Sequence, residues 1–322
     1  MNRSAVDAKI RRLFILILFA GTVAMVPAAS VFASGGRIPV YQPGTVIQAS
    51  GSYYLTRDLD GTALSSDVIT IQADDVTLDL NGHTLTAAAG YAGVSCDLHS
   101  NVTVRNGSVS GGTYGISLTS CSSIRIDHIS ASGFASAGIY AVSTSGNPDI
   151  SGVIEHCSMD AGGASVKGIL VEQASALVIR DNDMANASGD DGIYAYNSNG
   201  LDIAGNGVRG FGTGIFVYLC NNCRIENNTA SNNTGAGIEF DGNDNLVRGN
   251  TTNANTGSAY AGIDVMGGGF NVIAENTASR NGGYGIHLNL NGANVFLLNR
   301  TLGNSGGGIS GTTGNTNGGG NQ

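Results

Sequence analysis

Short apolar segments recur along the chain, and each opens with a glycine followed by isoleucine or valine. Examples are Gly115-Ile116 and Gly214-Ile215, and the pair returns at intervals of 22 to 30 residues between positions 93 and 309. A second apolar segment follows most pairs, as at Ile124-Arg125-Ile126. Apolar positions alternate with period 2 in these segments, which predicts β-strands. No interval contains an apolar face long enough to predict a helix.

Repeats of this length indicate a solenoid. One repeat cannot bury its own apolar side chains, but stacking at a strand spacing of about 4.8 Å buries a continuous core. We therefore expect a single all-β domain, a single-stranded parallel β-helix of about ten coils. Asparagines after the second segment are expected to form a hydrogen-bonded ladder between coils, at Asn106, Asn182, Asn206, Asn228, Asn250, Asn276 and Asn299.

The chain divides into four predicted parts. Residues 1–33 have a basic start, an apolar run and small residues before position 34, which is typical of a signal peptide; a retained anchor is the alternative. Residues 34–66 are expected to cap the first coil, residues 67–312 to form the β-helix, and residues 313–322 to be a flexible glycine- and asparagine-rich tail. No cap is evident at the C-terminal end, so an oligomer contact is expected there. We expect a secreted, periplasmic or cell-surface protein without a stable membrane span after signal removal.

Charge narrows the range of partners. The chain has 15 basic and 24 acidic residues, of which four basic residues and one acid lie in the predicted signal peptide. The mature chain would carry 11 basic and 23 acidic residues, a net charge of −12, with Lys167 as its single lysine. This charge argues against nucleic acid as a partner, and polyanionic glycans would need a bridging divalent cation. Five cysteines, an odd number, argue against a disulfide scaffold.

Two longer sequence motifs lie at the start of the repeat region, GSYYLTRDL at 51–59 and ITIQADDVTLDLNGHTL at 69–85. Because of these two motifs and the Gly-Ile repeat, residues 45–312 resemble the pectate-lyase-like right-handed parallel β-helix proteins, in particular their exported bacterial branch. The resemblance implies a right-handed helix, with the Gly-Ile strand in the first sheet and polysaccharide on the outer face of that sheet. It does not define an activity, because this fold supports lyases, hydrolases, epimerases, adhesins and metal-handling proteins.

Alternation predicts which side chains of the first sheet point outward. The first outward row is expected to contain Ser117, Tyr140, Leu170, Tyr194, Phe216, Glu239, Asp264, His287 and Ser310. The second is expected to contain Thr119, Val142, Glu172, Tyr196, Tyr218, Asp241, Met266 and Asn289. Sugar rings would stack on the aromatic members Tyr140, Tyr194, Tyr196, Phe216 and Tyr218. Sugar hydroxyls or calcium would bind to Glu239, Asp241, Asp264 and His287. The alternative is that the aromatic residues are ordinary strand formers and the acids keep the surface soluble.

Two adjacent carboxylates precede one first-sheet strand, and the register places Lys167 beside Asp191. Lys167, Asp190, Asp191 and Tyr194 are candidate catalytic residues, because paired carboxylates transfer protons when their pKa values differ. The double aspartate resembles the motif of polygalacturonase-like glycoside hydrolases, but residues 165–167 and 212–214 lack the partner residues of that motif. If the protein is an enzyme, a polysaccharide lyase is therefore favoured over a glycoside hydrolase, with Lys167, Tyr194 or His287 as base. The alternative is a surface ion pair between Lys167 and Asp191.

Histidines and cysteines give a third hypothesis, because some of them fall at equivalent positions of neighbouring coils. The residues concerned are His99 with Cys121, and His128 with His156; Cys157 follows His156 at a position of the asparagine ladder. Such clusters can bind copper or zinc, but two or three ligands are too few to assign a metal. The Cys-x-x-Cys pair ends at Cys223, which is expected to point inward as a small apolar side chain.

The leading functional hypothesis is an exported polysaccharide-binding β-helix protein that acts on the first-sheet face as a lyase or another carbohydrate-active enzyme. The first alternative is a non-catalytic structural or adhesin-like surface protein. The second is a periplasmic metal-handling accessory protein. No cofactor is assigned, and Ca²⁺ is the ion that the acidic residues would bind.

Overall fold

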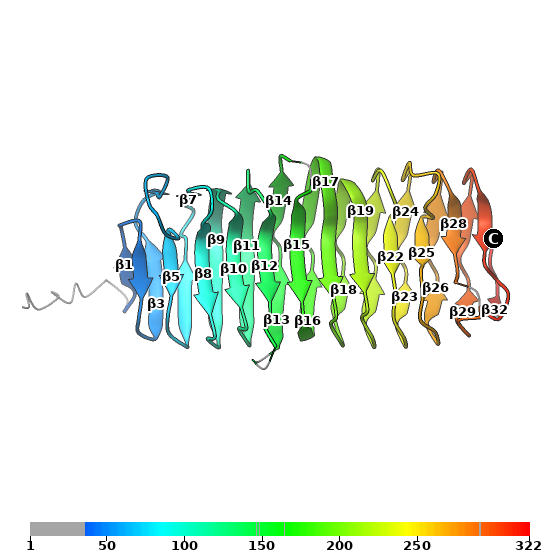
Figure 1. Cartoon of the computed structure of the whole chain (residues 1–322), viewed down its shortest axis with the longest axis horizontal. Helices are drawn as coiled ribbons and strands as arrows, with labels where there is room; N and C mark the ends of the chain where they lie inside the picture. Colours follow the sequence, from blue (N-terminus) through cyan, green and yellow to red (C-terminus); the bar gives the residue numbers. More distant parts are fainter. Residues whose placement is uncertain (1–35, 146, 148, 164, 290) are drawn as a thin grey trace, which may run out of the picture. The chain divides into compact units, whose positions relative to one another are not determined.

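The computed structural model describes residues 36–145, 147, 149–163, 165–289 and 291–322. In these residues the regular structure is β-strand, and the coils stack in chain order (Figure 1). The fold is a right-handed parallel β-helix of about 11 turns, so the predicted fold class is confirmed. The predicted signal peptide, residues 1–33, lies outside the described residues. Within the described part, no helix is long and apolar enough to cross a membrane.

Each coil contributes strands to three parallel sheets. The first sheet contains β2 (Thr45–Ile47), β5 (Ile69–Ile71), β8 (Ala92–Asp97), β10 (Tyr114–Thr119), β12 (Ala137–Val142), β15 (Lys167–Glu172), β17 (Asp183–Tyr196), β19 (Gly207–Tyr218), β22 (Ile238–Phe240), β25 (Ile263–Val265), β28 (Tyr284–His287) and β31 (Gly307–Ser310). The second sheet contains β1 (Ile38–Val40), β3 (Gly51–Leu55), β6 (Val76–Asp79), β9 (Val102–Gly111), β11 (Ile124–Ser132), β13 (Ile150–Glu155), β16 (Ala174–Arg180), β18 (Asp202–Ala204), β20 (Arg224–Glu226), β23 (Leu246–Arg248), β26 (Val272–Ala274), β29 (Val295–Leu297) and β32 (Thr316–Gly319).

The third sheet contains β4 (Leu59–Asp60), β7 (Thr84–Ala87), β14 (Ser158–Ala161), β21 (Thr229–Ser231), β24 (Thr251–Asn253), β27 (Thr277–Ser279) and β30 (Arg300–Leu302). Four long strands turn a corner and belong to two sheets. β9 and β11 run from the second sheet into the third, and β17 and β19 run from the third into the first. The register of β17 with β19 shifts between Ala185 and Gly189, and from Gly189 through Asp191 to Tyr196 it is the same as in the first-sheet strand.

The isoleucine of the Gly-Ile pair forms one column of the core. Ile169, Ile193 and Ile215 are aligned on successive coils, and each is 0% exposed. Burying one such side chain stabilises the fold by about 1.5–3 kcal/mol, so the repeated pair supplies a large share of the hydrophobic stabilisation. The side chain that follows each isoleucine must then point outward.

The glycine of the pair is required by close contact between coils. A Cβ atom added to Gly115 would lie 2.5 Å from the carbonyl oxygen of Gly138, and one added to Gly214 would lie 2.5 Å from that of Gly237. The same conflict with the glycine of the next coil recurs at Gly192 and Gly262. The glycine column therefore fixes how closely the coils approach at the start of the first sheet.

We expect Gly214→Ala to lower the free energy of unfolding by about 2 kcal/mol, because overpacking a tight site costs roughly 1–3 kcal/mol. Thermal or denaturant unfolding followed by circular dichroism measures the change. Gly162→Ala is the control, since a Cβ atom at Gly162 meets nothing within 4 Å. Equal stabilities of the two variants would contradict the steric role of the column.

Buried asparagines form the predicted ladder along the turn after the second sheet. The backbone N–H and the Nδ2 of Asn206 both donate to Oδ1 of Asn228, at 2.9 and 3.0 Å. The ladder starts at the backbone N–H of Cys157 and continues through Asn182, Asn206, Asn228, Asn250, Asn276, Asn299 and Asn321. Two further ladders, which the sequence analysis missed, contain Asn233, Asn255, Asn281 and Asn304, and Asn245, Asn271, Asn294 and Asn315.

The placement of Asn106 in this ladder is wrong. The register of β9, β11 and β13 aligns Asn106 with His128 and His156, one residue before the ladder position. Asn106 has a φ of 59°, and its Nδ2 donates to Oδ1 of Asp79 at 3.4 Å. Asparagine tolerates this left-handed conformation, which accounts for an asparagine at position 106 without a ladder hydrogen bond.

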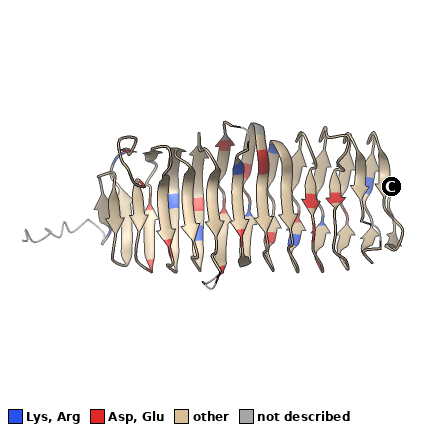
Figure 2. Cartoon of the chain, in the orientation of Figure 1, with Lys and Arg blue, Asp and Glu red and all other residues tan. Residues whose placement is uncertain are grey.

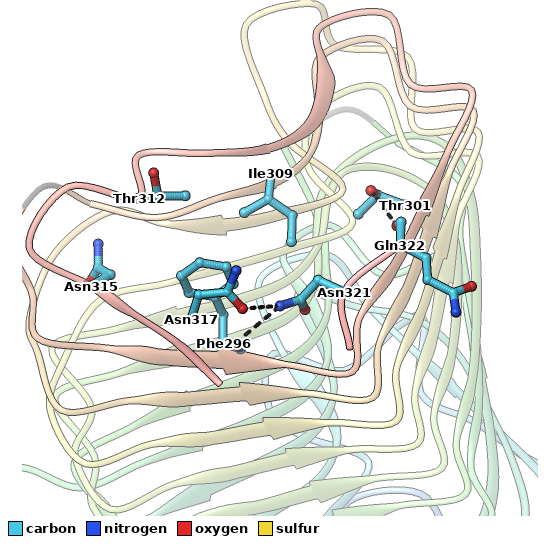
Figure 3. A pocket seen from close by; sticks show the side chains of 8 residues that line it. All are labelled: Phe296, Thr301, Ile309, Thr312, Asn315, Asn317, Asn321 and Gln322. Carbon is cyan, nitrogen blue, oxygen red and sulfur yellow. Dashed lines mark hydrogen bonds between the residues drawn. The ribbon is translucent and has the colours of Figure 1, made fainter. Parts of the chain in front are cut away.

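The C-terminal end of the stack holds a cavity of about 520 Å³ (Figure 3), lined by Phe296, Thr301, Ile309, Thr312, Asn315, Asn317, Asn321 and Gln322. The segment expected to be a flexible tail contains β32, which pairs with β29. Asn315 and Asn321 continue two ladders and hold this segment by hydrogen bonds, which explains the difference. The expected oligomer contact at this end stays a prediction.

Candidate functional site

The strand register places the predicted first outward row in one line. Leu170 pairs with Tyr194, Tyr194 with Phe216, and Phe216 with Glu239. Glu239 then pairs with Asp264, and Asp264 with His287. Side chains that are distant in sequence therefore follow one another along the first-sheet face at one coil per step.

Four aromatic rings lie together on this face. Tyr194 and Phe216 stack with centroids 5.6 Å apart, Phe216 and Tyr218 at 5.9 Å, and Tyr196 and Tyr218 at 6.0 Å. We call Tyr194, Tyr196, Phe216 and Tyr218 the aromatic platform. Its rings are partly exposed, so they offer π-faces to a ligand.

Tyr140 lies apart from the aromatic platform. Its ring contacts Tyr114 on the preceding coil, with centroids 4.4 Å apart. Leu170 occupies the row position between Tyr140 and Tyr194. Burial raises the pKa of the Tyr140 hydroxyl. Tyr140 therefore lies two coils before Tyr194, apart from the stacked rings with which it was grouped from sequence.

The candidate catalytic residues come together beside the aromatic platform. The Lys167 Nζ lies 2.6 Å from Oδ2 of Asp190, 3.8 Å from Oδ2 of Asp191 and 5.1 Å from the centroid of the Tyr194 ring. Lys167 and Asp191 are aligned as expected from the register, but Asp190 is the closer partner of the ammonium group. Backbone hydrogen bonds from Lys167 to Ser136 and from Asp190 to Val166 hold the cluster on its strands.

Asp190 and Asp191 have opposite environments. The Asp190 side chain is 53% exposed, whereas that of Asp191 is 10% exposed. Burial raises the pKa of Asp191 to about 7; the charges of Asp190 and Glu239 act in the same direction and Lys167 opposes them. At neutral pH, Asp191 is therefore divided between its protonated and ionised forms, which suits a group that both donates and accepts protons.

A second buried carboxyl group lies two coils further along. Glu239 is only 9% exposed, and burial together with the charge of Asp264 raises its pKa. Thr213 links it to the catalytic cluster, because Thr213 pairs with Asp191 in register and its Oγ1 donates to Oε2 of Glu239 at 3.4 Å. Thr213 is not among the site residues predicted from sequence, although alignment of the repeats places it next to Asp191.

An imidazole–carboxylate pair extends the row. The Nδ1 of His287 lies 2.8 Å from Oδ1 of Asp264, which leaves Nε2 facing away from the carboxylate. The pair borders a cavity of about 200 Å³ that Tyr260 and Tyr284 also line. Figure 2 shows acidic positions on the adjacent strands β22 and β25. Asp241, which follows β22, is half-buried at the edge of the same face.

Of the two histidine and cysteine clusters considered from sequence, the one around His128 and His156 forms and the one of His99 with Cys121 does not. Asp127, His128 and His156 form a cluster whose ligand atoms all lie within 4.8 Å of one another. His99 instead pairs with Asp74 at 3.2 Å, while the aligned Cys121 is buried in the core. The remaining cysteines of the described chain are also buried, at Cys96, Cys157, Cys220 and Cys223. The inward position expected for Cys223 is confirmed.

Two family models match the chain. One, described as periplasmic copper-binding protein (NosD), matches residues 150–319. The other, described as right handed beta helix region, matches residues 62–206. No curated protein matches the chain. The resemblance to right-handed β-helix proteins is thereby confirmed.

Solved structures share the fold. The periplasmic alginate epimerase AlgG is 17% identical, with a TM-score of 0.54 over 83% of this chain and 64% of that chain. An alginate lyase from Paenibacillus sp. str. FPU-7 is 13% identical, with a TM-score of 0.49 over 89% of this chain and 99% of that chain. This chain thus spans less than two thirds of the epimerase, and at such identities the likeness shows the fold alone.

Proposed function

We propose that this chain, which belongs to the family described as periplasmic copper-binding protein (NosD), is an exported, carbohydrate-active β-helix protein of the periplasm or cell surface. Its first-sheet face would bind a polysaccharide. The single observation that carries the proposal is the position of Lys167, whose Nζ lies 5.1 Å from the centroid of the Tyr194 ring in the aromatic platform and 3.8 Å from Asp191, a buried carboxyl group with a pKa raised to about 7. The fold shared with the alginate epimerase supports the same assignment.

The aromatic platform fits a sugar chain that runs along the coils. Tyr194 stacks with Phe216 and Tyr196 with Tyr218, each across one coil step, so sugar rings of a chain that runs along the coils can lie against the aromatic rings. Polar side chains border the rings on both sides, with Lys167 and Asp190 at one end and Asp264 and His287 at the other. This order provides apolar stacking in the centre and hydrogen bonds to hydroxyl groups around it.

We propose β-elimination on a uronate-containing polysaccharide as the reaction. The ionised form of Asp191 takes the proton next to the uronate carboxyl group, and the Lys167 ammonium stabilises the negative charge that develops there. The bond to the leaving sugar oxygen then breaks, and the Tyr194 hydroxyl protonates that oxygen. Burial, followed by nearby carboxylates, raises the pKa of Tyr194, so its hydroxyl suits a proton donor better than the base considered from sequence.

Calcium is the ion that would bridge the negatively charged first-sheet face and a negatively charged uronate substrate. Glu239 and Asp264 are adjacent in the row and supply oxygen ligands, which Ca²⁺ prefers. Copper fits this face poorly, because its groups are carboxylates with one imidazole, His287, whose Nδ1 faces Asp264. The proposed reaction therefore uses no step at copper.

An absorbance screen for unsaturated uronate products over alginate, pectin and glycosaminoglycans tests the reaction, with and without Ca²⁺. Product formation on one of them supports the proposal. Binding without product on every substrate would favour the non-catalytic surface protein, and the absence of both binding and product would overturn the carbohydrate assignment.

We expect Tyr194→Ala and Tyr218→Ala each to weaken glycan binding by roughly tenfold, because a lost stacking contact costs about 0.5–1.5 kcal/mol besides its buried area. A glycan array followed by calorimetry measures the change. Tyr41→Ala is the matched control, since Tyr41 is 52% exposed outside the first sheet. Tyr194→Phe retains the ring and should keep binding while losing turnover; unchanged binding in both alanine variants would exclude this face.

A further inference from the structure

We infer that Asp127, His128 and His156 form a binding site for a divalent transition-metal ion, Zn²⁺ or Cu²⁺. The three residues lie at the turn that follows the second sheet, on two successive coils. Asp127 is aligned with Glu155, and this register places the two imidazoles directly above one another. The ring centroids of His128 and His156 are 4.8 Å apart.

The ligand atoms already converge on one point. The Nδ1 atoms of His128 and His156 lie 2.5 and 3.1 Å from the same atom, Oδ1 of Asp127. In a tetrahedral zinc site with metal–ligand distances of about 2.0–2.1 Å, the ligand atoms are separated by roughly 3.3 Å. Only small side-chain rotations therefore separate this hydrogen-bonded cluster from a coordination geometry in which the metal replaces the shared protons.

The donor types select the class of metal. Two imidazole nitrogens and one carboxylate oxygen suit Zn²⁺ and Cu²⁺, whereas Cu⁺ prefers thiolate or thioether ligands. The neighbouring sulfur atom of Cys157 is buried, and the Cys157 thiol contacts the carbonyl oxygens of Ile126 and Glu155. The site therefore offers nitrogen and oxygen ligands without an accessible sulfur.

The backbone has the same conformation at both histidines. His128 and His156 have φ values of 53° and 52°, in the left-handed region. Histidine is enriched there but still rare, so the same conformation on two coils directs both side chains in the same way. Three protein ligands leave the outer side open, since the imidazoles are 61% and 43% exposed, and water can complete the coordination.

Neighbouring charges orient the carboxylate. The Nη2 of Arg125 lies 3.4 Å from Oδ2 of Asp127, which leaves Oδ1 for the two histidines. Arg125 and Arg180 are both paired with the buried Glu155, at 2.5 and 2.6 Å, so their positive charges are balanced. A hydrogen-bonded carboxylate of this kind is the arrangement that typically supports a metal site from outside its ligands.

This site is separate from the proposed sugar-binding face. It lies beyond the second sheet, whereas the aromatic platform belongs to the first. Of the three residues, Asp127 and His128 precede residues 150–319, the range that the copper-binding family model matches, and His156 lies within it. Metal binding at this cluster and cleavage of polysaccharide on the first-sheet face can therefore be tested separately.

Titration of the metal-free protein with Zn²⁺ by calorimetry, and with Cu²⁺ by electron paramagnetic resonance, tests the site. We expect one ion of either metal per chain in direct titration, with nitrogen couplings in the Cu²⁺ spectrum. His128→Asn should weaken binding about 100-fold or more, because one of three ligands is lost. Asparagine is the chosen replacement because it occupies the same turn position as Asn106 and tolerates the left-handed backbone.

His99→Asn is the matched control, because it removes a histidine whose Nδ1 faces one carboxylate, Asp74, outside the cluster. This variant should bind both metals like the unaltered protein, and circular dichroism should show that all variants fold. Unchanged binding in His128→Asn and His156→Asn, or an equal loss in His99→Asn, would overturn the inference. Absence of metal binding by the unaltered protein would do so directly.

Discussion

Replacing Asn228 with alanine is expected to lower the free energy of unfolding by about 3–5 kcal/mol, because several buried groups would lose their partners. Oδ1 of Asn228 accepts the backbone N–H and the Nδ2 of Asn206, and its own Nδ2 donates to the Ile203 carbonyl at 2.8 Å. Asn228 is 1% exposed, so water cannot replace these hydrogen bonds without opening the coil. Each buried polar group left without a partner costs about 1–3 kcal/mol.

Denaturant unfolding monitored by circular dichroism measures this loss, with Thr229→Ala as the control. Thr229 is the next residue, and it is exposed at the start of β21. The control should change stability by less than about 0.5 kcal/mol, as surface substitutions usually do. A similar small effect of Asn228→Ala would show that the ladder contributes little, and the asparagine repeat would then need another explanation.

Asp191→Asn is expected to stabilise the protein above neutral pH and to abolish turnover on the polysaccharide substrate. The buried carboxylate is unfavourable when it is ionised, which is why its pKa is raised to about 7. Each pKa unit corresponds to about 1.4 kcal/mol, so removing this group should raise the free energy of unfolding at pH 8 by roughly 2–4 kcal/mol. Loss of the proton acceptor should lower the rate by at least about 100-fold.

The direction of the pH dependence follows from proton binding. Between pH 4 and pH 7, the folded protein holds a proton on Asp191 that the unfolded chain has released. Stability therefore falls as the pH rises through this window, stays reduced above it, and is unaffected by this group below about pH 4. The variant should lack this part of the pH dependence, while the proposed lyase activity of the unaltered protein should rise with pH toward the ionised form.

Asp190→Asn is the control for Asp191→Asn, because it also removes one negative charge but at an exposed position. Asp190 adjoins Asp191, and its Oδ2 is the nearer partner of Lys167, but its side chain is 53% exposed. Unfolding measured from pH 4 to pH 8 should therefore show the lost pH dependence in Asp191→Asn and retain it in Asp190→Asn. The same pH profile in both variants would mean that Asp191 is not the buried titrating group.

The residues that are aligned on successive coils could be predicted from sequence, because a strict structural repeat determines this alignment. The alignment of Lys167 with Asp191, and of Tyr194 with Phe216, follows from counting residues after each Gly-Ile pair. The same counting located His128 and His156 on neighbouring coils. Pairing in a parallel sheet has one register when one face is buried, so positions along the coils are readable from sequence.

Burial and side-chain direction were less predictable. Glu239 was expected on the sugar-binding surface, but it is almost fully buried between Thr213 and Asp264. Tyr140 was grouped with the other aromatic rings, although its ring contacts Tyr114. Both results depend on rotamers and on the size of neighbouring side chains, which the strand pattern does not specify.

The glycine column also has a consequence for how such a protein can change in length during evolution. An insertion inside a first-sheet strand would put a side chain where only hydrogen fits, so selection should confine insertions to the turns. The chain shows this at one place. The connection from Val142 at the end of β12 to Ile150 at the start of β13 is longer than the one from Thr119 to Ile124 between β10 and β11. β12 nevertheless keeps its register with both neighbouring strands, and β13 pairs regularly from Gly152 onward after a shift at Ile150. New loops, and with them new specificities, can therefore be acquired at the turns without rebuilding the core.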